Sequence, residues 1–165
     1  MQLIVLFGLP GVGKSFVGNL LQTEFGFYHY DGDQSLPQIM KQAISQKLPI
    51  TDDMRDIFFT NLTQKTKELL TTHPKLVVSQ TFIKEKYREY FLNQIPQSQF
   101  ILIEANSTIR EKRLAARKEY PLDIEYSQKM TLIFEDPRIV HQKITNNIDG
   151  GLELKSNLQK ILDQG

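Results

Sequence analysis

The fold is decided by one stretch near the start of the chain: Leu3-Ile4-Val5-Leu6-Phe7, followed directly by Gly8-Leu9-Pro10-Gly11-Val12-Gly13-Lys14-Ser15. The first part is continuously apolar and ends at a glycine, which is typical of a strand buried on both faces of a parallel sheet. The second part matches the pattern G-x-x-x-x-G-K-[ST] in full. A glycine-rich turn that carries lysine and serine by chance is the alternative. The pattern lies between a buried strand and a helix expected at 14–25, and this context favours a phosphate-binding loop.

The chemistry of such a loop predicts binding of a nucleoside triphosphate with magnesium. The glycines let backbone N–H groups turn inward around phosphate oxygens, and the positive end of the following helix adds to the attraction. Lys14 would place its charge on the β- and γ-phosphates, where it would also act in catalysis, and Ser15 would offer its hydroxyl to the metal. With ATP and Mg²⁺ as cofactors, we expect nucleotide binding by Gly8, Leu9, Pro10, Gly11, Val12, Gly13, Lys14, Ser15 and Phe16.

Length and composition are those of an ordinary globular domain, and we expect the 165 residues to form one domain, 1–165. The formal net charge is +1, so we expect neither a nucleic acid nor a membrane as partner. The chain has no cysteine and three scattered histidines, which gives no support for a disulfide or a zinc site. The longest apolar stretch is too short to cross a bilayer. These features favour a cytoplasmic monomer or homodimer.

Strands and helices are expected to alternate along the chain. We expect strands at 3–7, 27–30, 75–79, 100–104 and 139–145, and helices at 14–25, 36–45, 52–70, 84–93, 108–118, 124–134 and 152–162. This order predicts a three-layer α/β domain with a parallel sheet and helices on both faces. Ligands of such sheets bind at the carboxyl ends of the strands. Three polar groups fall there: residues 8–15, Asp31-Gly32-Asp33 and Ser79-Gln80-Thr81.

Four further segments follow the loop in the order found in one known family. They are Tyr30-Asp31-Gly32-Asp33, Leu48-Pro49-Ile50-Thr51-Asp52-Asp53-Met54-Arg55, Val77-Val78-Ser79-Gln80-Thr81-Phe82-Ile83-Lys84-Glu85-Lys86-Tyr87-Arg88, and Arg113-Leu114-Ala115-Ala116-Arg117-Lys118 with Phe134-Glu135-Asp136-Pro137. On these segments the chain resembles the gluconate kinase family, within the shikimate- and nucleoside-monophosphate-kinase-like P-loop kinases. The resemblance implies a five-stranded parallel sheet in the order 2-3-1-4-5, with a lid at about residues 117–125.

The chain departs from the family pattern at two places. Gln34-Ser35-Leu36-Pro37 stands where the family has histidine-proline and an asparagine, and Glu119-Tyr120-Pro121-Leu122 replaces the usual continuation of the lid. Both departures affect the acceptor side and the lid, so the acceptor stays open. The loop half of the pattern is intact.

Asp31 and Asp33 are separated by one glycine and would project to one side if the chain is extended there. By the resemblance, Asp33 would accept the proton of an acceptor hydroxyl and Asp31 would bind the metal. A turn that caps the next helix is the alternative. Acceptor binding is then expected from Asp33, Arg55 and Gln80. The alternative for Arg55 is a salt bridge on a helix surface.

Arg110, Arg113 and Arg117 recur at helical spacing on one face. A solvated basic face is the ordinary explanation of such a stripe. Next to several phosphates, arginines on a closing lid would neutralise transition-state charge. We therefore expect Arg113 to contact the nucleotide and Arg117 to act in catalysis.

The resemblance implies an ATP- and Mg²⁺-dependent kinase that transfers the γ-phosphoryl group to a hydroxyl of a sugar acid or a similar small molecule. Two alternatives stay open. One is a kinase of another acceptor, such as a shikimate-like acid or a nucleoside monophosphate. The other is a nucleotide-binding regulatory protein without phosphotransfer.

Overall fold

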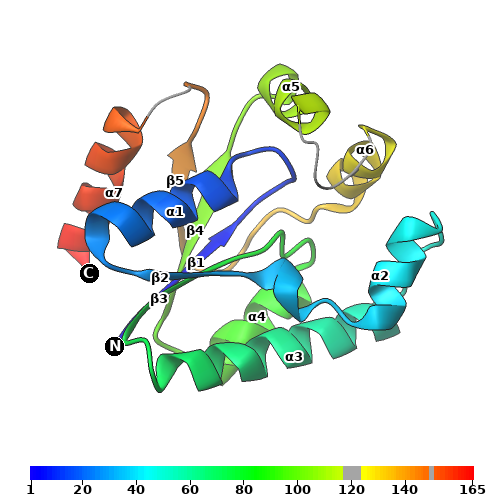
Figure 1. Cartoon of the computed structure of the whole chain (residues 1–165), viewed down its shortest axis with the longest axis horizontal. Helices are drawn as coiled ribbons and strands as arrows, with labels where there is room; N and C mark the ends of the chain where they lie inside the picture. The colour runs from blue at the N-terminus through cyan, green and yellow to red at the C-terminus, as the bar shows by residue number, and fades with distance from the viewer. Residues whose placement is uncertain (117–123, 149–150) are drawn as a thin grey trace.

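Five parallel strands form the central sheet, in the spatial order β2-β3-β1-β4-β5 (Figure 1). This computed structural model describes residues 1–116, 124–148 and 151–165. The strands are β1 (Gln2–Phe7), β2 (Tyr28–Asp31), β3 (Lys75–Ser79), β4 (Ser98–Glu104) and β5 (His141–Thr145). The predicted fold class and strand order are confirmed.

Helices cover both faces of the sheet, and their bounds follow the sequence pattern closely. They are α1 (Lys14–Phe25), the 3₁₀ helix η1 (Gly32–Ser35), α2 (Gln38–Ser45), α3 (Asp52–Leu70), α4 (Glu85–Gln94), α5 (Ser107–Ala116), α6 (Ile124–Ile133) and α7 (Leu152–Gln164). None of the helices in the described ranges is long and apolar enough to cross a bilayer.

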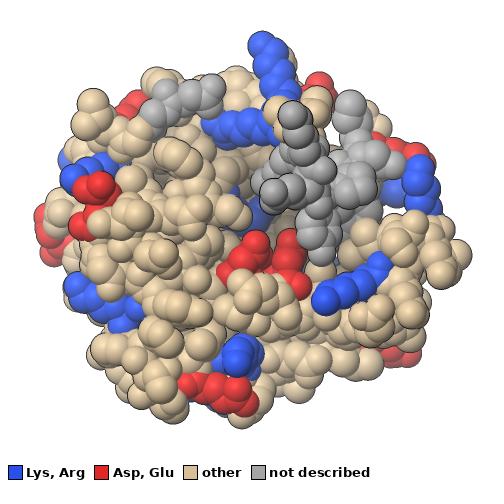
Figure 2. All heavy atoms as spheres, viewed as in Figure 1, with Lys and Arg blue, Asp and Glu red and all other residues tan. Residues whose placement is uncertain are grey.

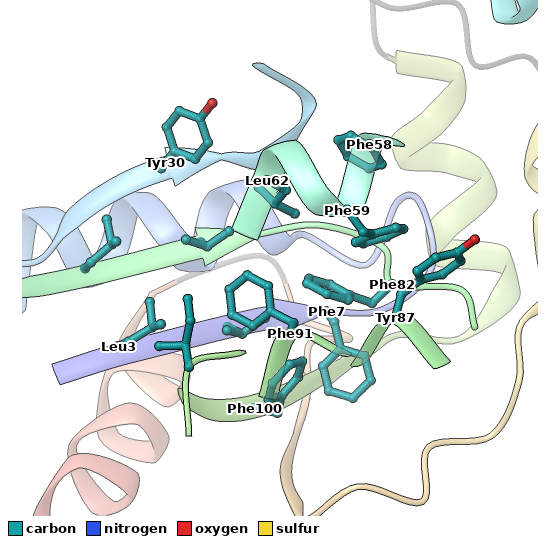
Figure 3. Packing of buried hydrophobic residues seen from close by; sticks show 14 of the residues in the cluster. Leu3, Phe7, Tyr30, Phe58, Phe59, Leu62, Phe82, Tyr87, Phe91 and Phe100 are labelled. Carbon is teal, nitrogen blue, oxygen red and sulfur yellow. The ribbon is translucent and has the colours of Figure 1, made fainter. Parts of the chain in front are cut away.

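β1 is apolar from Leu3 to Phe7 because it supplies both halves of the core. Successive side chains of a strand point to opposite faces. Leu3, Val5 and Phe7 face the layer of α3 and α4, where they join the aromatic cluster of Figure 3. Ile4 and Leu6 face the layer of α1 and α7. All five side chains are fully buried, as expected for a central strand of a three-layer domain.

One helix begins later than expected. The sequence pattern predicts a helix at 36–45, but α2 begins at Gln38 and a separate 3₁₀ turn precedes it. Asp31 causes this turn, because its carboxylate accepts a hydrogen bond of 2.9 Å from the N–H of Asp33. The backbone is therefore extended at Asp31 but helical at Asp33. An extended chain through both residues, which would project the two carboxylates to one side, is not what the structure shows.

α1 lies tightly against His29 of β2 at Gly18. A β-carbon added there would lie 2.5 Å from His29 Nε2, and the ring cannot turn aside because both nitrogens are bonded. Nδ1 donates to Asn19 Oδ1 and Nε2 accepts from Ser79 Oγ, each at 2.9 Å. Burial lowers the pKa of His29 although nearby Asp31 opposes this, which favours the neutral ring with Nδ1 as its donor.

Gly18→Ala should therefore destabilise the protein, although alanine in a helix is usually better than glycine by roughly 0.5–1 kcal/mol. Overpacking against the fixed ring should lower the free energy of unfolding by about 1–3 kcal/mol in urea titrations. In a His29→Ala background the same change should be neutral or stabilising. Equal effects in the two backgrounds would contradict the contact.

Candidate active site

A cavity of about 820 Å³ opens at the carboxyl ends of β1, β2 and β3. Its wall combines residues from the loop after β1, η1, α2, α3 and the loop after β3. Figure 2 shows acidic side chains gathered in the middle of this face, where η1 lies in Figure 1. Of the residues singled out from the sequence, the cavity brings together Pro10, Lys14, Ser15, Asp31, Asp33, Arg55 and Gln80.

The phosphate-loop backbone is shaped by its own lysine. Lys14 Nζ donates to the backbone oxygens of Gly8 at 2.8 Å and Leu9 at 2.9 Å. Gly13 has a φ of 95°, and a β-carbon there would collide with the side-chain amide of Asn146. The loop therefore tolerates no side chain at this position.

The amino end of α1 is left open for an anion. No side chain caps Gly13, the residue before the helix, and the first turn holds no acidic residue. The first N–H groups of a helix lack partners within the helix, and together they carry a partial positive charge. This end of α1, with Lys14 and Ser15 beside it, has the donor set that binds phosphate oxygens.

Arg113 and Asn146 brace the phosphate loop from the side of α5 and β5. Arg113 Nη1 lies 3.3 Å from the backbone oxygen of Gly11 and 3.1 Å from that of Val12, and Nη2 donates to the backbone oxygen of Asn146 at 2.9 Å. The buried side-chain amide of Asn146 also donates to Val12, at 2.9 Å. The sequence analysis missed Asn146, although it is a polar residue directly after a strand, as in the other site segments.

Asp33 is oriented by the loop after β3. Gln80 Nε2 donates to Asp33 Oδ1 at 3.0 Å, while Gln80 Oε1 accepts from the N–H of Thr81 at 2.7 Å. Both ends of the glutamine amide are engaged, so its orientation is set. Asp31 caps η1 and lines the same cavity as Asp33.

Other predicted site residues lie in different surroundings. Arg55 lines the cavity with 12% of its side chain exposed, and its Nη1 is 3.3 Å from Asp52 Oδ1. The ring of Phe16 is 49% exposed and is not among the residues that line the cavity. Arg117, together with residues 118–123 of the expected lid, lies outside the described residues.

A buried ion pair, absent from the expected site, fixes the loop after β3. Arg88 is fully buried, and its Nη1 donates to Glu85 Oε2 at 2.7 Å. Its other nitrogens donate to the backbone oxygens of Phe82, Ile83 and Glu135 at 2.8, 3.1 and 2.7 Å. Since Glu135 follows α6, this one guanidinium joins the loop after β3 to the segment that leaves α6.

Glu85 completes this tie from the other side. Its Oε1 accepts from the backbone N–H groups of Arg138 and Ile139, at 2.9 and 2.6 Å. Burial alone would raise the pKa of Glu85, but the hydrogen bonds from Arg88 and the two backbone groups outweigh it and hold the pKa below its ordinary value of 4.5. The pair lies outside the cavity and holds in place the loop after β3, which lines it.

A family model described as an AAA domain (AAA_33) matches residues 3–135. The chain belongs to this family. AAA_33 is a family of P-loop domains, and the match spans the phosphate loop, both aspartates and the loop after β3. The predicted nucleotide-binding P-loop architecture is confirmed.

The chain is similar to proteins that are named as gluconokinases and shikimate kinases. A probable gluconokinase of Dictyostelium discoideum is 21% identical over 98% of this chain and 83% of its own length. A shikimate kinase of Chlorobium phaeobacteroides is 26% identical over 91% of this chain and 84% of its own length. A solved gluconokinase from Sinorhizobium meliloti matches with a TM-score of 0.76 and 22% identity, over 99% of this chain and 97% of its own. The predicted resemblance and the phosphotransferase class are confirmed.

The lowered pKa of Glu85 predicts a component of stability that acid removes. The unfolded chain takes up the proton first, so this component is complete well above pH 4.5 and is lost as the pH falls below it. Glu85→Gln should lower the free energy of unfolding by about 3 kcal/mol at neutral pH, because it leaves Arg88 buried without its charged partner.

The difference in stability between wild type and Glu85→Gln should begin to narrow as the pH falls below 4.5, because the unfolded wild-type chain then takes up a proton. It should be smallest once the pH has passed the lowered pKa of the folded carboxyl, which is then neutral too. Urea titrations across this range measure it. Glu89→Gln, an exposed change on the same helix, is the matched control and should differ little from wild type at any pH. A constant difference between Glu85→Gln and wild type would contradict the assignment.

Proposed function

We propose that the protein transfers the γ-phosphoryl group of ATP, with Mg²⁺, to a hydroxyl of a small acceptor such as a sugar acid. The observation that carries the proposal is that one cavity is lined by Lys14, Ser15, Asp31 and Asp33. The phosphate-binding groups, which are Lys14 and the open amino end of α1, thus lie next to the carboxylates of Asp31 and Asp33. In this proposal residues 1–165 act as one P-loop kinase domain.

The residues present fit a nucleotide with its metal ion. The open amino end of α1 and Lys14 suit the phosphates, and the Arg113–Asn146 brace supports the loop from behind. No cluster of three or more histidine, cysteine or acidic side chains that could hold a metal alone occurs in the described ranges. Ser15 and Asp31 would therefore share Mg²⁺ with the phosphates, as Mg²⁺ commonly binds in such sites. The ion would neutralise charge on the transferred group.

Asp33 is the group we assign to the acceptor proton. Gln80 donates to Oδ1 and so orients the carboxylate toward an acceptor in the cavity. Arg55, on the same wall, would bind the acceptor. Positioning of this kind supplies much of the rate in phosphoryl transfer. We further propose that Arg117 stabilises transition-state charge and that residues 117–125 form a lid that excludes water.

The relatives leave more than one acceptor class open. Their names include both gluconokinase and shikimate kinase, so a shikimate-like acid or a nucleoside monophosphate is the second candidate. A regulatory role without phosphotransfer is the third. ADP release with a panel of sugar acids, polyols, shikimate and nucleoside monophosphates tests all three. Tight ATP binding with no acceptor-dependent ADP release would favour the regulatory role.

Nucleotide binding through the loop predicts that Mg²⁺ and ATP raise the melting temperature. At a ligand concentration about 100 times Kd the gain is about 2.7 kcal/mol, because the ligand binds only the folded state. Lys14→Ala should remove most of the rise in a thermal-shift assay. Lys41→Ala, a lysine of the same cavity on α2, is the control and should keep it. A full rise with Lys14→Ala would contradict the assignment of the loop.

The proton-accepting role predicts that Asp33→Asn keeps nucleotide binding and loses phosphotransfer. The amide oxygen can still accept from Gln80, but the group cannot take up a proton at neutral pH. The rate of acceptor-dependent ADP release should fall by about 10²- to 10⁴-fold. Asp31→Asn should mainly raise the Mg²⁺ requirement. Asp53→Asn, an exposed carboxylate on α3, is the control and should keep the wild-type rate. A wild-type rate in Asp33→Asn would show that the carboxylate is only structural.

A further inference from the structure

The half of the cavity beyond Asp33 has an apolar wall. Side chains from α2, α3, the loop after β3 and α6 line it, among them Met40, Ile44, Phe58, Phe59, Phe82 and Met130. Three aromatic rings form its base: Phe59 lies 4.8 Å from Phe58 and 5.0 Å from Phe82, measured between ring centroids. An acceptor that reaches Asp33 from this side must therefore place most of its body against hydrocarbon.

Tyr87 lines this wall too, and its hydroxyl is bonded to α3. The ring stacks on Phe59, with the ring centroids 4.4 Å apart (Figure 3). The hydroxyl donates to Asp56 Oδ1 at 2.8 Å. Burial first, and then the bond to Asp56, raise the pKa of Tyr87, so the hydroxyl stays a donor held by that carboxylate. The proton of the Tyr87 hydroxyl is thus engaged within the protein before an acceptor binds.

Polar groups near the transfer point are largely engaged with the protein. Ser79 Oγ bonds to His29, and both ends of the Gln80 amide are bonded, to Asp33 and to Thr81. Gln34 and Thr81 also line the cavity, and beyond these two the wall offers few polar side chains to an acceptor with several hydroxyl groups. Each hydroxyl group that is buried against the apolar wall without a partner weakens binding by roughly tenfold.

Two basic side chains supply the charge that this half of the cavity lacks. The side chain of Arg55 is 12% exposed, and it shares its partner Asp52 with Lys84. Lys84 Nζ lies 2.6 Å from Asp52 Oδ1, closer than Arg55 Nη1 at 3.3 Å. The guanidinium can therefore turn a face toward the cavity. Lys41 of α2 lines the same space and forms no ion pair within the described ranges. An anionic group on the acceptor would be held between these two cations.

From this distribution we propose that the acceptor is a hydroxy acid with an apolar aromatic body and a single reacting hydroxyl, which narrows the proposed acceptors away from polyhydroxylated sugar acids. The inference rests on the proposed function. The hydroxyl oxygen forms a bond to the γ-phosphorus, and the bond from that phosphorus to the β,γ-bridging oxygen breaks. The electron pair leaves with ADP, and the hydroxyl proton passes to Asp33.

Three probes separate the two requirements of body and charge. The first probe, 4-(hydroxymethyl)benzoate, has an apolar ring, one primary hydroxyl and one negative charge. The second, gluconate, has the same charge and also a primary hydroxyl, but on a polar chain. The third, 4-methylbenzyl alcohol, has the ring and the hydroxyl without the charge. Binding is measured by calorimetry with Mg²⁺ and a non-hydrolysable ATP analogue, and turnover by ADP release with ATP. The aryl acid should bind at least about tenfold more tightly than either other probe.

Two variants test whether the preference for the aryl acid arises from the apolar wall at Met40 and from the charge of Arg55. Met40→Gln keeps the side-chain length but makes the wall polar, and should weaken binding of the aryl acid by about 5- to 10-fold with little effect on gluconate. Met54→Gln on α3, which does not line the cavity, is the matched control and should change neither. Arg55→Gln should remove the preference for the aryl acid over the neutral alcohol.

Each result decides one of the two claims. Gluconate binding as tightly as the aryl acid, or binding of neither acid, would overturn the apolar acceptor and leave the proposed kinase to the wider panel. A second outcome is that the aryl acid binds tightly, that Met40→Gln weakens this binding, and that no phosphorylated product forms. This outcome would support the apolar site and overturn the kinase function. Phosphorylation of the aryl acid with the higher kcat/KM supports both.

Discussion

The loop after β3, which lines the candidate site, depends on the buried guanidinium of Arg88. Taking such a charge out of water costs several kcal/mol, and it is tolerated only where partners surround it. Glu85 and three backbone oxygens accept its hydrogen bonds, and the rings of Phe7 and Phe134 lie 5.3 and 4.8 Å from it. The loop after β3 can hold its shape, including the left-handed φ of 49° at Phe82, because this group satisfies its oxygens. The bonds that Arg88 makes to this loop in the core thus determine how the loop residues that line the cavity are placed.

Sequence reasoning recovered the fold because each layer leaves a local pattern. β1, α1 and α3 have uninterrupted apolar or amphipathic signals with clear ends at Gly8, Gly26 and Thr51, and their observed bounds agree with the expected ones within a residue. The 3₁₀ turn before α2 was missed because it arises from one side-chain hydrogen bond at Asp31, a contact that no periodicity reveals. Strand order came from the family resemblance, because local patterns do not encode which strands are neighbours.

The site was predictable where the chain itself brings the residues together. Lys14 and Ser15 follow from one continuous motif, and Asp31 and Gln80 from their positions just after strands. Asn146 and the pair of Glu85 and Arg88 were missed because their partners are backbone groups far away in sequence. Arg113 shows the same limit: its helical spacing suggests a basic surface, yet its guanidinium lies against the loop between β1 and α1.

The bonds inside the phosphate loop bear on how quickly a nucleotide can be captured. Lys14, Arg113 and Asn146 together hold five backbone oxygens of the loop and its neighbours, which makes this segment rigid before any phosphate arrives. A rigid receptor loses little conformational entropy on binding, and no slow rearrangement has to precede the encounter. The rate of nucleotide capture then depends on diffusion and on the electric field of the open helix end. The residence time of the nucleotide depends on how readily Lys14 exchanges the backbone oxygens of Gly8 and Leu9 for phosphate oxygens.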